Sequence, residues 1–233
     1  MNRKTYIFLC ISVFVLISAI LLSFISVDKA VKTSNNIADF KPTIIIDAGH
    51  GGEDGGASTE NNILEKDINL KISLKLKDIF ETNGFSVILT RENDTDLSTS
   101  DKNKKREDLK NRVSLFNNSV DNVVISIHQN KFTDPKYRGA QIFYSDNHEN
   151  NKNLAECIRK SIIQTLQPYN ERQNKKAGSE IFILDNTNVP AILIECGFLS
   201  NYEDISLLTN NEYQNKLAFS IYVGFLEYYY TNY

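Results

Sequence analysis

Two short apolar runs in this chain each lead into a histidine, and this repeated pattern limits the possible folds more than any other feature. Residues 44–46 are three isoleucines that lead through Asp47 into a glycine-rich loop holding His50. Residues 123–127 are Val-Val-Ile-Ser-Ile, and His128 follows at once. Such runs predict buried β-strands. Each histidine is therefore expected just past the carboxyl end of a strand, where open α/β sheets bind ligands.

Extended and helical patterns alternate along the rest of the chain. The expected strands cover residues 43–47, 85–90, 123–128, 140–144, 180–184 and 191–195, and the expected helices cover residues 64–80, 107–117, 154–166 and 213–230. Strands that alternate with helices predict an α/β fold. We expect three layers, α/β/α, around a mainly parallel mixed sheet of about six strands.

The composition excludes some classes of function. The chain has 233 residues, a net charge of -3 and 41% hydrophobic residues, which suffices for one domain with a sizeable core. A nucleic-acid partner is not expected, because the chain lacks a basic surplus or stripe. The glycine loop 49–56 lacks the Gly-Lys-Ser/Thr ending of a phosphate loop, so nucleotide binding is not expected either.

The N-terminal segment, residues 1–27, is predicted to be a membrane anchor or a signal segment. Residues 7–27 carry no charge and are long enough to span a bilayer, and a short basic stretch precedes them. The absence of a clear cleavage site favours an uncleaved anchor. The basic flank should stay in the cytoplasm, which places the rest of the chain outside it. Residues 28–41 are predicted to be a polar linker, and residues 42–233 the catalytic domain.

The three cysteines give a weaker signal. Cys10 lies in the N-terminal segment, whereas Cys157 and Cys196 lie in the domain. We expect two buried thiols, because cysteine packs as a small hydrophobe, although the pair could form one disulfide. A nucleophilic Cys196 is not expected, because no histidine shares its local sequence.

The histidines point to a metal site. His148 lies in a polar loop and is expected to be solvated, whereas His50 and His128 share the strand-end context. Two histidines and one glutamate are a common ligand set for catalytic zinc, and Glu65 is the candidate third ligand. However, Asn62-x-x-Glu65 also matches a capping box, in which the glutamate only satisfies backbone N–H groups. The residues alone leave this open. A non-haem iron site uses similar ligands and is disfavoured outside the cytoplasm.

Glu195 is the best candidate for a general base. It ends the apolar strand 191–194, where an unpaired carboxylate is costly to bury. Such a carboxylate requires a cation, a metal or a catalytic proton. Beside a metal that lowers the pKa of water to about 7, it would support hydrolysis of an amide or ester. Arg112 could orient an acidic substrate group or pair with a surface carboxylate. The glycines beside His50 should let the chain turn and keep room for substrate.

Six blocks of sequence carry a family resemblance that runs from residue 43 to residue 228. They are residues 46–52 (IDAGHGG), 64–67 (LEKD), 89–91 (LTR), 126–130 (SIHQN), 138–140 (RGA) and 194–201 (IECGFLSN). Together they closely resemble the zinc-dependent N-acetylmuramoyl-L-alanine amidases. The resemblance implies that His50, Glu65 and His128 bind Zn²⁺, which favours the ligand role of Glu65 over the capping box. It also implies that Glu195 is the catalytic glutamate and that peptidoglycan is the substrate.

The resemblance adds expectations about the fold and the substrate groove. It implies a fold of the phosphorylase/hydrolase type. Asn130, in the same block as His128, is a candidate substrate contact, as is Arg112. Gln129 departs from the family pattern, which usually has a small or apolar residue there, and we expect it to alter the groove.

Residues 64–68, 107–112 and 138–144 are similar to the spore-cortex or germination-type branch of the family. That branch removes the peptide from muramic acid, the first step towards muramic-δ-lactam in cortex peptidoglycan. The resemblance implies an extracytoplasmic enzyme, and the absence of wall-binding repeats suggests an activating or targeting partner protein. Two alternatives stay open. One is a zinc peptidase acting on stem peptides. The other is a non-catalytic wall-binding module, which the presence of all four site residues disfavours.

Overall fold

The structure is a computed structural model that describes residues 41–100 and 102–233. The described chain forms one compact unit, Lys41–Tyr233. The predicted anchor or signal segment, residues 1–27, lies outside the described residues, as does the predicted linker apart from Lys41. Within the described part, no helix has the length and apolar character needed to cross a membrane.

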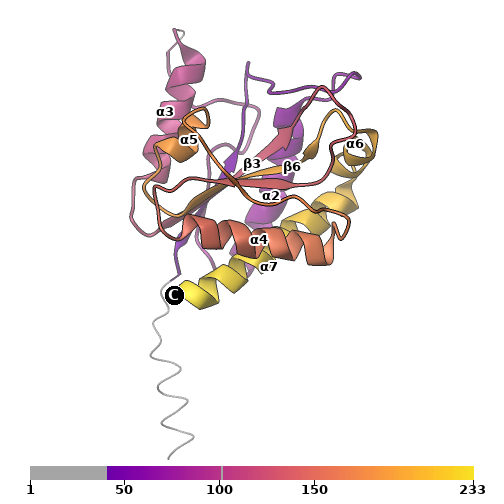
Figure 1. Ribbon diagram of the computed structural model, residues 1–233. Coiled ribbons are helices and arrows are strands. Elements are labelled where there is room, and N and C mark those ends of the chain that lie inside the picture. The colour runs from indigo at the N-terminus through magenta and orange to yellow at the C-terminus, as the bar shows by residue number, and fades with distance from the viewer. Residues whose placement is uncertain (1–40, 101) are drawn as a thin grey trace, which may run out of the picture. The chain divides into compact units, whose positions relative to one another are not determined.

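A six-stranded mixed sheet forms the middle layer (Figure 1). Its strands are β1 (Thr43–Ala48), β2 (Val87–Leu89), β3 (Asn122–Asn130), β4 (Gln141–Tyr144), β5 (Lys175–Lys176) and β6 (Ala191–Phe198). The order across the sheet is β2-β1-β3-β6-β4-β5. Neighbours from β2 to β6 run parallel, β4 runs antiparallel to β6, and β5 runs parallel to β4. The predicted mainly parallel mixed sheet is confirmed.

Helices cover both faces of this sheet. They are α2 (Glu65–Thr82), α3 (Lys104–Phe116), α4 (Asn151–Thr165), α5 (Phe182–Asp185), α6 (Tyr202–Leu208) and α7 (Asn211–Asn232). The larger apolar core joins the sheet to α2, α4 and α7, and the smaller core joins it to α3 and α5. Figure 1 shows α4 and α7 on one side of the sheet and α3 and α5 on the other. The predicted α/β/α layering is confirmed.

The alternation of side chains along each strand decides which face carries the polar strand ends. On β6, Ile194 packs into the larger core and Leu193 into the smaller one, so Glu195 shares the α3 face with Leu193. On β3, Val124 packs into the smaller core, and two further steps of the same period place His128 on that face. The register pairs His128 directly with Glu195. Both polar residues follow the stretch of strand that packs in the smaller core.

The structure corrects one predicted element and adds two. The strand expected at residues 180–184 is wrong, because this segment ends in the short helix α5. Ile183 and Leu184 are both buried in the smaller core, and a strand would send these neighbours to opposite faces. The sequence also misses β5, which is two exposed lysines, and α6, which starts where the Asn201 side chain accepts a hydrogen bond from the Asp204 N–H.

Cys157 on α4 and Cys196 on β6 are buried free thiols. Both belong to the larger apolar core, so each contributes as a small hydrophobic side chain. The disulfide alternative is therefore not realised, and the expected pair of buried thiols is confirmed.

Candidate active site

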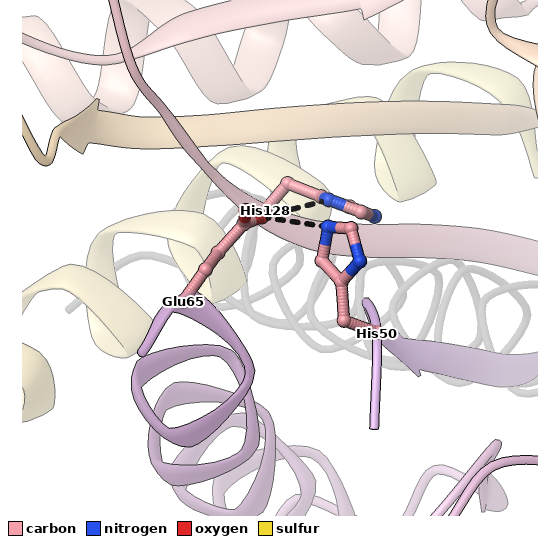
Figure 2. Close-up of side chains that lie close together, drawn as sticks. All are labelled: His50, Glu65 and His128. Carbon is pink, nitrogen blue, oxygen red and sulfur yellow. Dashed lines mark hydrogen bonds and ion pairs between the residues drawn. The ribbon is translucent and has the colours of Figure 1, made fainter. Parts of the chain in front are cut away.

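His50, Glu65 and His128 come from three different elements and meet at one point (Figure 2). One potential ligand atom from each residue lies within 4.8 Å of the other two. Glu65 Oε1 lies 3.2 Å from His50 Nε2 and 3.0 Å from His128 Nδ1, so one carboxylate oxygen joins the two imidazoles. His148 is not part of this group; its Nδ1 accepts a hydrogen bond from the Asn150 N–H.

His50 is held by its own loop. Its backbone adopts φ = 62°, an unusual left-handed conformation for a residue other than glycine. Its Nδ1 lies 2.9 Å from Asp54 Oδ2, which leaves Nε2 directed at Glu65. Burial opposes ionisation of Asp54, but the hydrogen bond and charge of His50, the Gly56 N–H and the charge of Lys105 together outweigh burial and lower the pKa of Asp54 to about 2. A carboxylate behind a histidine fixes the ring for metal binding. The sequence analysis assigned no role to Asp54, although its place in the glycine loop was a signal.

Two glycines make room for the candidate ligands. A Cβ on Gly49 would overlap the ring of His128. Gly56 has φ = 66°, and a Cβ there would lie 2.6 Å from Glu65 Oε2 and 2.7 Å from His50 Cδ2. The expectation that the glycines beside His50 keep room for substrate is therefore wrong for Gly49, because the ring of His128 fills the room there.

Glu65 is the first residue of α2, and its carboxylate turns towards the histidines. Oε1 accepts a hydrogen bond from the Gln129 N–H at 3.0 Å, and Oε2 accepts one from the Ala57 N–H at 2.8 Å. The Asn62 N–H donates to the Thr59 carbonyl instead, so the capping box does not form. Burial would raise the pKa of Glu65, but hydrogen bonds with the two histidines outweigh it and hold the pKa well below its usual range.

Gln129 lies behind the site and not in a groove. Its side chain is 3% exposed, and its amide donates to Asn69 Oδ1 at 3.0 Å. Asn69 in turn donates to the Gly49 carbonyl at 3.1 Å and to Glu65 Oε1 at 3.3 Å. The expectation that Gln129 alters the groove is wrong, because its side chain faces α2. The sequence also missed Asn69, whose signal was its position four residues after Glu65 on one helix face.

The Arg112 side chain binds groups at the carboxyl end of β1 and is not free to bind substrate. Its side chain is 2% exposed. Nη1 lies 2.5 Å from Asp47 Oδ1, Nε donates to Asp108 Oδ2 at 2.8 Å, and Nη2 donates to the His50 carbonyl at 2.8 Å. Both expectations for Arg112 therefore need correction: its main partner carboxylate is buried, and its donors are used inside the protein. Arg112 positions the loop that carries His50.

Arg91 supports the same turn from the other side. Its Nε donates to the Ala48 carbonyl at 2.9 Å, and its Nη2 donates to the carbonyls of Gly49 and Lys66 at 3.1 and 2.8 Å. These bonds tie the end of β1 to the first turn of α2. The two ligand-bearing segments are thus joined by a buried arginine. The sequence analysis assigned it no role, although it closes the block at residues 89–91.

Glu195 lies across from His128 on the adjacent strand. Its side chain is partly buried, and its Oε2 is enclosed without a hydrogen-bond partner in the described part of the chain. Burial raises the pKa of Glu195 to about 7, with a further rise from the Glu65 charge and an opposing effect of His128. A carboxyl group with a near-neutral pKa beside two imidazoles is suited to proton transfer.

The donor set fits a zinc ion. Two imidazoles and one carboxylate are ligands that zinc favours, and each of His50 and Glu65 has a second partner that orients it. The enclosed Oε2 of Glu195 lacks a hydrogen-bond partner among the described residues, and it lies on the strand next to His128. Asn130, two residues beyond His128, lines a neighbouring cavity of about 290 Å³, where it can contact a substrate.

Comparison with known proteins agrees with this geometry. The family model described as N-acetylmuramoyl-L-alanine amidase matches residues 44–227. The germination-specific N-acetylmuramoyl-L-alanine amidase of Bacillus subtilis strain 168 is 40% identical over 190 residues, which cover 80% of this chain and 79% of that protein.

Solved structures give the same result. The CwlD amidase from Clostridioides difficile, solved in complex with the GerS lipoprotein, matches with a TM-score of 0.78 and 42% identity over 82% of this chain and all of that one. An N-acetylmuramoyl-L-alanine amidase from Clostridium difficile 630 matches with a TM-score of 0.72 and 30% identity over 84% of this chain and all of that one. The resemblance seen in the sequence is confirmed. The chain belongs to the N-acetylmuramoyl-L-alanine amidase family and is an amidase that acts on peptidoglycan.

Proposed function

We propose that this amidase depends on zinc and cuts the amide bond between the lactyl group of N-acetylmuramic acid and L-alanine. The observation that carries the proposal is the convergence of His50, Glu65 and His128, with Glu195 in register beside them. Bound zinc would polarise the lactyl carbonyl and lower the pKa of a water molecule to about 7.

Glu195 is the proposed general base. Its carboxylate takes a proton from the attacking water and later passes it to the α-amine of L-alanine as that amine leaves. Such a proton transfer typically contributes a factor of ~10²–10⁴ to the rate. The pKa of about 7 supports this role, because the group is then close to balance between its two protonation states near neutral pH.

Two of the three candidate ligands, His50 and Glu65, have supports of their own, and these define what the chain itself does for the metal. Asp54 holds the His50 ring, while Asn69 and the backbone of Gln129 hold the Glu65 carboxylate. Arg112 holds the carbonyl of His50 from beneath. Because the ligands are fixed before binding, the site should need little rearrangement to take an ion.

The cellular role that we propose is removal of stem peptides from cortex peptidoglycan, as a step towards muramic-δ-lactam for germination. The germination-specific relative and the CwlD structure support it, together with the branch-specific segments of the sequence. The reaction would then take place outside the cytoplasm, in the cell envelope and the cortex compartment of the spore. Anchoring through residues 1–27 remains part of this proposal.

A partner protein is also proposed, to activate or target the enzyme. The support is that the similar CwlD amidase was solved in complex with the GerS lipoprotein. Affinity purification of the full-length chain from sporulating cells should recover a stable companion. Recovery of the enzyme alone, under conditions that preserve envelope complexes, would count against the partner.

Mass spectrometry of digested peptidoglycan tests the proposed reaction. Purified enzyme should release intact stem peptides and leave muramic acid without peptide. Exhaustive chelation should stop the release, and added zinc should restore it. Release of single amino acids would instead favour a zinc peptidase, and zinc binding without turnover on any wall substrate would favour a non-catalytic module.

A further inference from the structure

The cavity that Asn130 lines lies beside β4, on the face of the sheet that carries Glu195. Gln141 of β4 pairs in register with Glu195, and Phe143 of β4 pairs with Lys175 of β5. Residues directly opposite one another on paired strands project from the same face. The row Glu195, Gln141, Phe143 and Lys175 therefore leads from the candidate base to the edge of the sheet. The cavity of about 290 Å³ lies along this row.

The lining of this cavity is aromatic and cationic. The aromatic rings belong to Phe132, Tyr137, Phe143 and Phe198, and the cations are Arg172 and Lys175. No aspartate or glutamate belongs to the lining. A cavity with two positive charges and no negative charge favours an anionic ligand.

Arg172 is held in place by groups that do not neutralise it. Its Nη1 donates to Gln141 Oε1 at 2.8 Å, and its Nε donates to the Arg138 carbonyl at 3.1 Å. Its guanidinium carbon lies 4.6 Å from the ring centre of Phe198. The charge of Asp204 acts on Arg172, but among the described residues no carboxylate lies within ion-pair distance of it, and its Nη2 has no acceptor.

Lys175 extends this charge to the edge strand. Its ammonium lies 5.6 Å from the ring centre of Phe143 and makes no ion pair with any described carboxylate. The buried Arg112 shows the contrast, because it is matched by Asp47 and Asp108. Planar guanidinium groups held over aromatic rings are suited to binding carboxylates.

The spacing of the sheet relates this cavity to the substrate. Adjacent strands lie about 4.8 Å apart, so β5 lies roughly 10 Å from β6 and its candidate base. An extended peptide advances about 3.3–3.6 Å per residue. A carboxylate two or three residues beyond the scissile amide would therefore reach the two cations. The N-acetylated sugars of the glycan arm offer no such series of carboxylates.

We propose that Arg172 and Lys175 bind a carboxylate on the peptide arm of the substrate, within about three residues of the scissile amide. This inference rests on the proposed function, which places the scissile bond beside Glu195. It gives the substrate a direction: the peptide runs over β4 towards β5, and the glycan leaves the site on the opposite side.

A pair of matched substrates tests the proposal. One is an N-acetylmuramoyl peptide with free carboxylates beyond L-alanine, and the other is the same compound with those groups converted to carboxamides. The wild-type holoenzyme should show a kcat/KM about tenfold higher for the acid, because a charge-assisted hydrogen bond is lost in the amide. Single carboxamides at the second and third residues would show which carboxylate is bound.

Variants separate binding from folding. Arg172→Gln and Lys175→Gln should each lower kcat/KM for the acid more than kcat/KM for the carboxamide, so that the preference for the acid shrinks, and Arg172→Lys should recover part of the preference. Lys71→Gln, at an exposed lysine on α2, is the matched control for a lost charge and should keep the full preference. Zinc content and melting temperature should match wild type in Lys175→Gln, whose side chain is exposed.

Two outcomes would overturn the inference. Equal kcat/KM for acid and carboxamide in the wild type would do so while leaving the amidase function intact. So would a preference that both Gln variants retain. If the zinc-loaded wild type cleaves neither substrate, the proposed function is wrong, and the assignment of Arg172 and Lys175, which rests on it, is wrong as well.

Discussion

Two carboxylates end apolar strands on the same face of the sheet, and the fold treats them in opposite ways. Asp47 at the end of β1 is 0% exposed, and its oxygens lie 2.5 Å from Arg112 Nη1 and 2.6 Å from Ser126 Oγ. Burial opposes its ionisation, but Arg112 outweighs burial and lowers the pKa of Asp47. Glu195 on β6 has an oxygen without a donor, and burial raises its pKa to about 7.

The difference separates a structural carboxylate from a chemical one. Asp47 is ionised and locked, so it can hold Arg112 beneath the His50 loop but cannot exchange a proton near neutral pH. Glu195 keeps an unpaired oxygen beside the candidate ligands, so it can accept and release a proton.

Replacing Glu195 with Gln should have the largest effect. The amide cannot accept the proton of the attacking water, so kcat should fall by ~10²–10⁴-fold. Zinc content should stay at the wild-type level, because the three ligands are untouched. Kinetics on muropeptides, with metal analysis of the same samples, would check this. Full activity in the variant would remove Glu195 as the base.

Replacing Arg112 with Met should remove the cation that neutralises Asp47, the structural carboxylate of the two. The change leaves the Asp47 charge buried without its cation, which should lower the free energy of unfolding by about 3–5 kcal/mol. Urea unfolding of the wild type and the variant gives the measurement.

The double variant Asp47→Asn with Arg112→Met is the matched control, because it removes Arg112 together with the Asp47 charge and leaves only the charge of Asp108 without its cation. It should be less destabilised than Arg112→Met alone. Equal destabilisation would show that lost packing, and not the buried charge, accounts for the effect.

The two carboxylates should also give opposite pH dependences in the metal-free protein. The pKa of Glu195 rises from 4.5 to about 7, so the folded state binds more protons between these values and the free energy of unfolding falls as pH rises through them. At 1.36 kcal/mol per pKa unit this amounts to about 3 kcal/mol at most. Asp47 has a lowered pKa, so its stabilisation is present above the ordinary pKa and is lost as pH falls below it.

Urea unfolding of chelated wild type and Glu195→Gln at pH 5 and pH 8 measures the Glu195 contribution. The variant lacks the titrating group, so its stability advantage over the wild type should grow from pH 5 to pH 8. A constant difference between the two proteins would contradict the raised pKa.

A third carboxylate, Asp54, extends the comparison, and we expect its replacement to have the smallest effect of these variants. Asp54 is paired like Asp47, but its partner is the candidate ligand His50. Asp54→Asn should weaken zinc binding by about 10–100-fold, because the His50 ring loses its orienting carboxylate. Competition with a chromogenic chelator would measure the affinity. Lys71→Gln serves as a distant surface control, and an unchanged affinity in Asp54→Asn would rule out this support.

The local pattern predicted those site residues that depend on strand register alone. The apolar runs before His128 and Glu195 indicated buried strands, and the period of two in a strand then fixes which face their last residues share. The family blocks added Glu65. The same pattern failed at residues 180–184, where packing onto the smaller core favours a helical turn for two adjacent apolar side chains.

The sequence by itself thus determined the α/β layering, the positions of the two histidines near the carboxyl ends of β1 and β3, although His128 lies within β3 and not past it, and the cost of a carboxylate at Glu195. Only the tertiary structure decided the partners: that Glu65 faces the histidines and not its own helix end, that Arg112 is buried against Asp47, and that Asp54 and Asn69 hold the ligands. The reason is physical. A strand's period is a local property of the chain, whereas the charge and hydrogen bonds around a buried group come from residues far away in sequence, such as Arg112, 65 positions from Asp47.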